Sequence, residues 1–160
     1  MAYSNNGGYG GYNRGFQGGQ SRPQPRRDSD RPAPEILPEA VPADYIDRAE
    51  AVIKELTESR RNITTSKIRN LLSLVSGIYD AEKLRTAQEL TPDSVSRVGM
   101  MRIRTAYEAG RDDTVKTFVE KARLLQYMKG IGSSREDLIR FAHYMEALVA
   151  YHRFYGGREA

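Results

Sequence analysis

The chain has 160 residues, 39% of them hydrophobic, which is enough for one ordinary domain with some chain left over. Cysteine is absent, which excludes a disulfide framework, thiolate metal sites and a thiol nucleophile. The net charge of +4 and the pI of about 9.4 are compatible with a polyanionic partner, although many basic proteins bind none, and 19 of the 25 basic residues are arginine. Arginine presents a planar fork that matches phosphate oxygens, although a GC-rich genome would produce the same excess.

Residues 1 to about 42 form a separate compositional zone. The run 7–19 is rich in glycine and tyrosine and has no apolar period, so we predict that it is disordered. Six of the seven prolines follow between Pro23 and Pro42, which predicts a stiff, extended spacer. Such a tail, with five arginines, either makes weak contacts to a polyanion or only keeps the chain in solution. Residues 43–160 are expected to form a helical domain.

Helical periodicity begins at Ala43, and no alternating strand pattern follows it. The first helix is predicted over about 44–59. Thr64 or Thr65 can cap the second helix, and a short turn is predicted around 81–89. The sequence has no run of about 18 apolar residues and no apolar core of a signal peptide near its start, so neither a membrane span nor secretion is expected.

A third long helix is predicted after the turn. Thr91 and Pro92 fit its N-cap and first position, and Gly110 should close it. Asp112 or Asp113 can then cap a fourth long helix.

The fourth helix is expected to continue until Gly130 and Gly132 break it. Ser133 and Ser134 each have an acidic residue three positions later, so either can open the last helix with a capping box. That helix should end at the glycine pair 156–157, and its few polar residues predict a place at the centre of the fold. Together these elements predict an all-α fold, a compact bundle of about five helices preceded by a disordered N-terminal tail.

Residues that carry chemistry are scarce. His143 and His152 lie nine residues apart on one helix, on opposite faces and about 13 Å apart along the axis, so they cannot share a metal. His152 extends the apolar stripe and is interpreted as a packed structural residue, and the adjacent Asp112 and Asp113 as capping residues. The sequence has no phosphate-cradling glycine loop and no nucleophile elbow. We therefore expect no catalytic residue, no metal, no cofactor and no enzymatic activity.

The basic residues remain. Arg97, Arg104 and Arg111 recur every seven residues, so they project from nearly the same side of the third helix, and Arg102 lies off this row. The other candidates stand at the start of the second helix and along the fourth. Separately each fits a solvated face or a surface ion pair, and together they form a candidate track for a phosphate backbone. The predicted RNA-binding residues are Lys67, Arg69, Arg97, Arg102, Arg104, Arg111, Lys116, Lys121 and Arg123.

Three segments, in order, resemble one known family. They are Ile-Thr-Thr-Ser-Lys-Ile-Arg-Asn-Leu-Leu at 63–72, Ala-Tyr-Glu-Ala-Gly-Arg at 106–111 with the residues that follow it, and the run from Phe141 to His152. The family is the small subunit of type III-A CRISPR effector complexes, the Csm-type family. The resemblance covers roughly 60–157 and leaves out the tail before Pro42.

The resemblance implies a bundle of about five helices, several copies of which stack as an inner filament along guide RNA and target RNA. It implies as partners these two RNAs, the backbone and large subunits of the complex, and further copies of the chain, in the cytoplasm and without a membrane. It also implies that other subunits carry the catalytic activities. RNA binding is implied for Lys67, Arg69, Arg111 and Lys116, which lie within the matching motifs, whereas the other basic positions depend on charge geometry alone.

Three other functions stay open at this point. A helical DNA-binding module would use 65–72 as a recognition helix after the short turn at 60–63. A protein adaptor would pack its helix faces against neighbours and pair its arginines with carboxylates. An enzyme is the most distant of the three.

Overall fold

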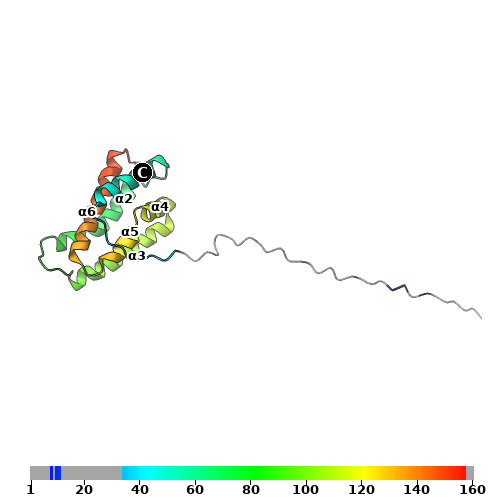
Figure 1. The fold of residues 1–160 in the computed structure, drawn as a ribbon, viewed down its shortest axis with the longest axis horizontal. Helices are drawn as coiled ribbons and strands as arrows, with labels where there is room; N and C mark the ends of the chain where they lie inside the picture. The colour runs from blue at the N-terminus through cyan, green and yellow to red at the C-terminus, as the bar shows by residue number, and fades with distance from the viewer. Residues whose placement is uncertain (1–7, 9, 12–33, 158–160) are drawn as a thin grey trace, which may run out of the picture. The chain divides into compact units, whose positions relative to one another are not determined.

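The computed structural model describes residues 8, 10–11 and 34–157. Within these residues the chain forms six α-helices and no strand, which confirms the all-α class (Figure 1). The helices are α1 (Tyr45–Glu58), α2 (Thr65–Glu82), α3 (Pro92–Arg111), α4 (Asp113–Lys121), α5 (Leu124–Ile131) and α6 (Arg135–Phe154). No helix of the described part is long and apolar enough to cross a bilayer. Most of the predicted tail, including most of the glycine-rich run, lies outside the described residues.

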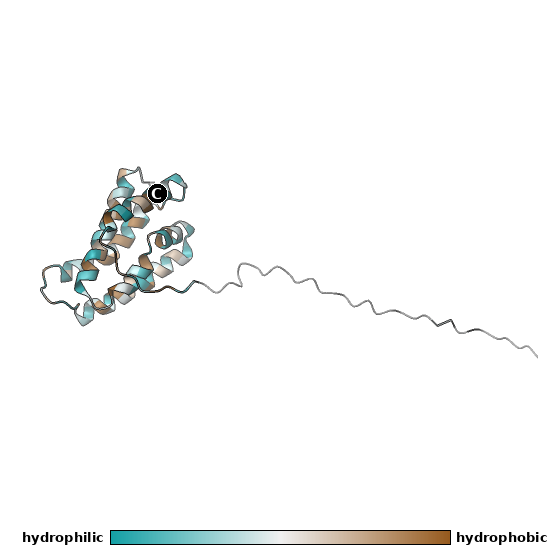
Figure 2. Cartoon of the chain, viewed as in Figure 1, coloured by the Kyte–Doolittle hydropathy of each residue, from teal (hydrophilic) through white to brown (hydrophobic). Residues whose placement is uncertain are grey.

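The last helix, α6, is the centre of the packing. It contacts α1, α2 and α5, and its buried side chains include Leu138, Phe141, Met145 and Leu148. Every helix combines hydrophobic and hydrophilic residues (Figure 2), so each can turn one side to the core and the other to water. Burial of these apolar side chains is the main force that holds the helices together.

Four of the five helices after α1 begin at a capping side chain. Thr64 caps α2, Thr91 caps α3 with Pro92 at its first position, and Ser134 caps α6. Asp112 accepts hydrogen bonds from the first free N–H groups of α4. The sequence left a choice between neighbours at three of these positions, and the cap that forms is the one whose oxygen reaches an amide two or three residues later.

Two predicted helix ends were wrong. Gly110 does not close α3, which continues to Arg111, because Gly110 keeps helical backbone angles instead of the left-handed ones that end a helix. The fourth helix does not continue to Gly130. It stops at Lys121, the chain turns at Arg123 with a φ of 55°, and α5 follows as a separate helix.

The segment before α1 is part of the helical unit. We call residues 35–41 the N-terminal strap. Its Val41 is buried, the amide of Glu39 donates to the Gln126 carbonyl at 3.0 Å, and the Arg123 guanidinium binds the Glu39 carboxylate. Gly130 allows this approach, because a Cβ there would overlap the backbone of Glu39. The unit therefore begins at Glu35, ahead of the boundary expected at Ala43.

Glu82, the last residue of α2, joins that helix to the start of α3. Its carboxylate is buried and accepts hydrogen bonds from the Thr91 amide at 3.2 Å, the Thr91 hydroxyl at 3.1 Å and Arg85 Nη1 at 2.6 Å. Burial alone would raise the pKa of this carboxyl, but the hydrogen bonds from Ser94, Arg85 and Thr91 outweigh it and hold the pKa at about 2. Glu82 is therefore ionised in the folded protein.

Replacing the Glu82 carboxylate tests how much its hydrogen bonds between α2 and α3 contribute to stability. We expect Glu82→Gln to lower the free energy of unfolding at pH 7 by about 2–3 kcal/mol, because charge-assisted hydrogen bonds to a buried group are lost. The folded pKa of Glu82 lies below its ordinary value of 4.5, so its stabilisation is complete above that value and disappears as the pH falls towards about 2. Urea unfolding at pH 7 and at pH 3 measures both effects. The exposed Asp80→Asn is the control and should change stability by less than about 0.5 kcal/mol.

Candidate nucleic-acid interface

The helices α2 and α3 run antiparallel and are joined at both ends. Glu82 joins the end of α2 to the start of α3, and Lys67 in the first turn of α2 forms an ion pair with Asp112 at the end of α3. The Lys67 ammonium, with the Thr114 hydroxyl, holds the pKa of the Asp112 carboxyl well below its ordinary value. The surface between the two helices is therefore held at both of its ends.

A hollow of about 390 Å³ lies between these helices. Arg97 and Arg104 enter it from α3, and a Cβ on Gly77 of α2 would lie 2.7 Å from Arg97 Nη2, so this glycine leaves room for the guanidinium. Neither arginine forms an ion pair with any described residue. We call this hollow the α2–α3 groove; it is lined by Ser73, Leu74, Gly77, Ile78, Arg97, Met100, Met101 and Arg104.

The third arginine of the predicted row is placed differently. Arg111 is exposed, with Nη1 3.6 Å from the Glu108 carboxylate and its guanidinium carbon 5.7 Å from the centre of the Tyr107 ring. It follows Arg104 by seven residues on the same side of α3 but does not line the groove. The groove therefore brings together two of the three arginines in the row.

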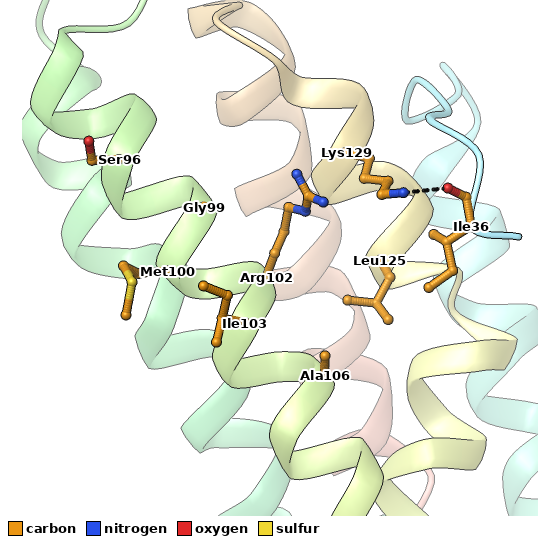
Figure 3. A pocket seen from close by; sticks show the side chains of 9 residues that line it. All are labelled: Ile36, Ser96, Gly99, Met100, Arg102, Ile103, Ala106, Leu125 and Lys129. Atoms are coloured by element: carbon orange, nitrogen blue, oxygen red, sulfur yellow. Dashed lines mark hydrogen bonds between the residues drawn. The ribbon is translucent and has the colours of Figure 1, made fainter.

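On the other side of α3 lies a more apolar hollow of about 620 Å³, next to α5 and the strap. Arg102 and Lys129 extend along it, and Lys129 Nζ donates to the Ile36 carbonyl at 2.7 Å (Figure 3). Ile103 and Leu125 supply apolar surface there. Arg102 is thus separated from the row, as its position off that row predicted.

The other predicted cations are dispersed. Lys121 Nζ lies 2.6 Å from the Glu55 carboxylate and ties α4 to α1, and Arg123 binds Glu39 in the strap. Arg69 is exposed on α2, forms no ion pair with a described residue and lines none of the hollows described. Lys116 lines a third hollow, beside the turn that joins α1 and α2.

That third hollow contains two cations that sequence periodicity did not single out. Arg60 and Arg61 lie in the turn between α1 and α2, where no helical period identifies them. The only signal in the sequence was an adjacent arginine pair just before a capping threonine. The structure adds both of them to the candidate interface.

On α3, partly along the wall of the apolar hollow, lies a stripe of large exposed apolar side chains. Met100 is 50% exposed, Ile103 62% and Tyr107 65%. Their spacing of three and four residues places them on one line along the helix. Exposed apolar stripes of this kind mark surfaces that contact other macromolecules. We call these three residues the α3 apolar stripe.

Neither histidine lines any of the three hollows. His152 is buried, with Nε2 2.6 Å from the Ile63 carbonyl oxygen, which confirms its structural role. The His143 ring packs edge-on against Tyr79 at a centroid distance of 5.6 Å. The described residues contain no group of three or more side chains that could hold a metal ion.

Known proteins match nearly all of the helical unit. The model of the family described as Csm2 Type III-A matches residues 39–158. A protein of Streptococcus thermophilus named CRISPR system Cms protein Csm2 is 46% identical over 118 residues, which cover 72% of this chain and 93% of that protein. The protein of the same name from Mycobacterium tuberculosis is 41% identical over 113 residues, 69% of this chain and 90% of its own length. In Enterococcus italicus a protein of that name is 33% identical over 95 residues, 58% of this chain and 68% of its own length.

The matched region contains all three segments that carried the resemblance and begins inside the strap, at Glu39. The family match and the curated relatives confirm the resemblance read from those segments. The chain therefore belongs to the Csm2 type III-A family, the small subunit of type III-A CRISPR effector complexes.

Proposed function

We propose that this chain is a non-catalytic structural subunit that binds the backbone of guide RNA and target RNA in the α2–α3 groove and so supports antiviral interference. The observation that carries the proposal is the pair Arg97 and Arg104, which share one groove and have no carboxylate partner among the described residues. An arginine without an internal partner keeps its charge available for a phosphate.

The groove fits a phosphate backbone better than a base edge. Its polar groups are the guanidinium groups of Arg97 and Arg104 and the hydroxyl of Ser73, which lie beside methionine and leucine side chains. Contacts of this kind position a strand and carry no sequence information. Pairing between guide and target would supply specificity, and the catalytic steps would belong to other subunits.

The nine predicted cations are unequal in this proposal. Lys67, Arg111, Lys121 and Arg123 each have a carboxylate partner, so a phosphate would compete with that partner. The other five form no ion pair with a described residue and are the stronger candidates. These five are Arg69, Arg97, Arg102, Arg104 and Lys116.

The α3 apolar stripe supports a second part of the same function, contact with neighbouring proteins. The partners would be the backbone and large subunits and further copies of the chain, in the cytoplasm. An apolar stripe flanked by cations suits a protein surface that combines apolar and acidic residues. A protein adaptor would use this stripe alone, without RNA.

Removing both groove arginines tests RNA binding. We expect Arg97→Gln with Arg104→Gln to weaken binding of single-stranded RNA at least about tenfold and to reduce the log–log salt slope by about 1.4, because two phosphate contacts are lost. The slope of the parent protein should be near −3 for about four contacts. Fluorescence anisotropy across a salt series, on the isolated protein and on the assembled complex, measures both quantities.

The matched control is Arg48→Gln with Lys54→Gln, which removes the same charge from two cations of α1 that already pair with Asp44 and Glu50. An equal effect of the two double variants would mean that only net charge matters and would contradict the groove. Stronger binding of duplex DNA than of RNA would instead favour a DNA-binding module.

Ile103→Glu tests the stripe. Ile103 is exposed, so the variant should fold normally, whereas a glutamate buried in an apolar contact should strongly reduce incorporation into the complex. Co-purification with the other subunits measures incorporation. Leu84→Glu, at an exposed residue of the loop after α2, should assemble normally. Normal assembly of Ile103→Glu would exclude the stripe as a contact surface.

A further inference from the structure

The turn after α1 holds an arginine in a backbone conformation that favours glycine. Arg60 has a φ of 56°, its amide donates to the Thr57 carbonyl at 3.2 Å, and the Arg61 amide donates to the Leu56 carbonyl at 3.1 Å. This pair of hydrogen bonds is the Schellman motif that closes many helices, and its left-handed position is usually glycine because a Cβ is crowded there. An arginine at this position destabilises the turn relative to glycine.

A second arginine with positive φ shows what normally offsets that strain. Arg123 has a φ of 55°, and its guanidinium binds both carboxylate oxygens of Glu39, with Nε at 2.9 Å. This bidentate contact holds the strap, so the side chain stabilises the fold. The Arg60 guanidinium forms no hydrogen bond and no ion pair with any described residue. Within the described fold, nothing offsets the strain at Arg60.

The Arg60 side chain opens onto the third hollow, of about 490 Å³, which Arg61 and Lys116 also line. None of these three cations forms an ion pair with a described residue. Two carboxylates, Asp113 and Glu120, line the same hollow, so its formal charge is one positive unit. This single positive charge matches the one negative charge of a phosphodiester better than the roughly two negative charges of a terminal phosphate.

This hollow lies beside the turn before α2 and along α4, the helix that follows α3, and it shares no lining residue with the α2–α3 groove. Near the start of α3, Arg97 lies against Gly77 in the second half of α2. At the end of α3, Asp112 pairs with Lys67 in the first turn of α2. Asp112 is also the N-cap of α4, the helix that presents Lys116. The arginine row therefore runs about 21 Å along α3 from Arg97 to Arg111 and leads towards the turn that holds Arg60.

We infer that Arg60, Arg61 and Lys116 form a second phosphodiester site, which receives the RNA strand where it leaves the α2–α3 groove. Arg60 keeps its left-handed conformation, at a cost in stability, because its guanidinium binds a phosphate. This inference rests on the proposed RNA binding and extends it to residues outside the nine predicted cations.

Arg60→Gly distinguishes an effect on RNA binding from an effect on stability, because it should raise the Tm and lower the affinity for RNA. We expect the Tm to rise by about 3 °C as the strain is removed. Affinity for single-stranded RNA should fall about threefold to tenfold, and the log–log salt slope should decrease by about 0.7, since one phosphate contact is lost. Thermal unfolding and anisotropy with labelled RNA, on the full chain, measure all three quantities.

Three variants control the test. Arg60→Lys keeps the charge and the strain but replaces the guanidinium fork with a point charge, so its Tm should equal that of the parent and its affinity should lie between those of the parent and Arg60→Gly. Arg123→Gly removes the same strain together with the Glu39 contact, so its Tm should fall. Arg48→Gln lowers the net charge equally at a paired residue and should leave the affinity unchanged.

Each adverse result has a distinct meaning. If Arg60→Gly binds RNA as the parent does while the Arg97 and Arg104 double variant is weakened, the second site is overturned and the proposed function stands. If both variants bind normally, the proposed function fails and the second site fails with it. A lower Tm for Arg60→Gly would show that its side chain stabilises the fold and would overturn the explanation from strain.

Discussion

The antiparallel pairing of α2 and α3 is the constraint on which the candidate surfaces depend. At one end, the buried carboxylate of Glu82 accepts a hydrogen bond from the hydroxyl of Thr91, the N-cap of α3, and at the other end Lys67 forms an ion pair with Asp112. Both contacts are charge-assisted and join residues from different helices. They hold the groove arginines on a fixed surface, so RNA binding would need little further ordering of the backbone.

Ion pairs divide the predicted cations into two groups. Three cations with a carboxylate partner connect elements of the fold, namely Lys67 with Asp112, Lys121 with Glu55 and Arg123 with Glu39. Several cations without such a partner line the hollows beside α3 and around the turn after α1, among them Arg97, Arg104 and Arg60. On α3 itself the α3 apolar stripe offers a surface of different chemistry. One helix therefore combines a candidate face for RNA with a candidate face for protein, which suits a structural subunit of a multisubunit CRISPR complex.

The sequence alone predicted the helix caps, the central position of α6 and a number of helices within one of that observed. These features could be predicted because a cap and an apolar period are local in sequence. The break at Arg123 could not, since it depends on a carboxylate in the strap, 84 residues away. The pairing of Lys67 with Asp112 was hidden for the same reason: periodicity identifies the faces of a helix but not its neighbours. Arg60 and Arg61 were missed because a turn has no period.

The proposal places RNA along the α2–α3 groove. The most direct measurement is crosslinking of photoreactive RNA in the assembled complex, followed by mass spectrometry of the modified peptides of this chain. We expect adducts in peptides from the second half of α2 and the first half of α3, around Ser73 to Gly77 and Arg97 to Arg104. Adducts confined to α1 or α6, with none in those peptides, would contradict it.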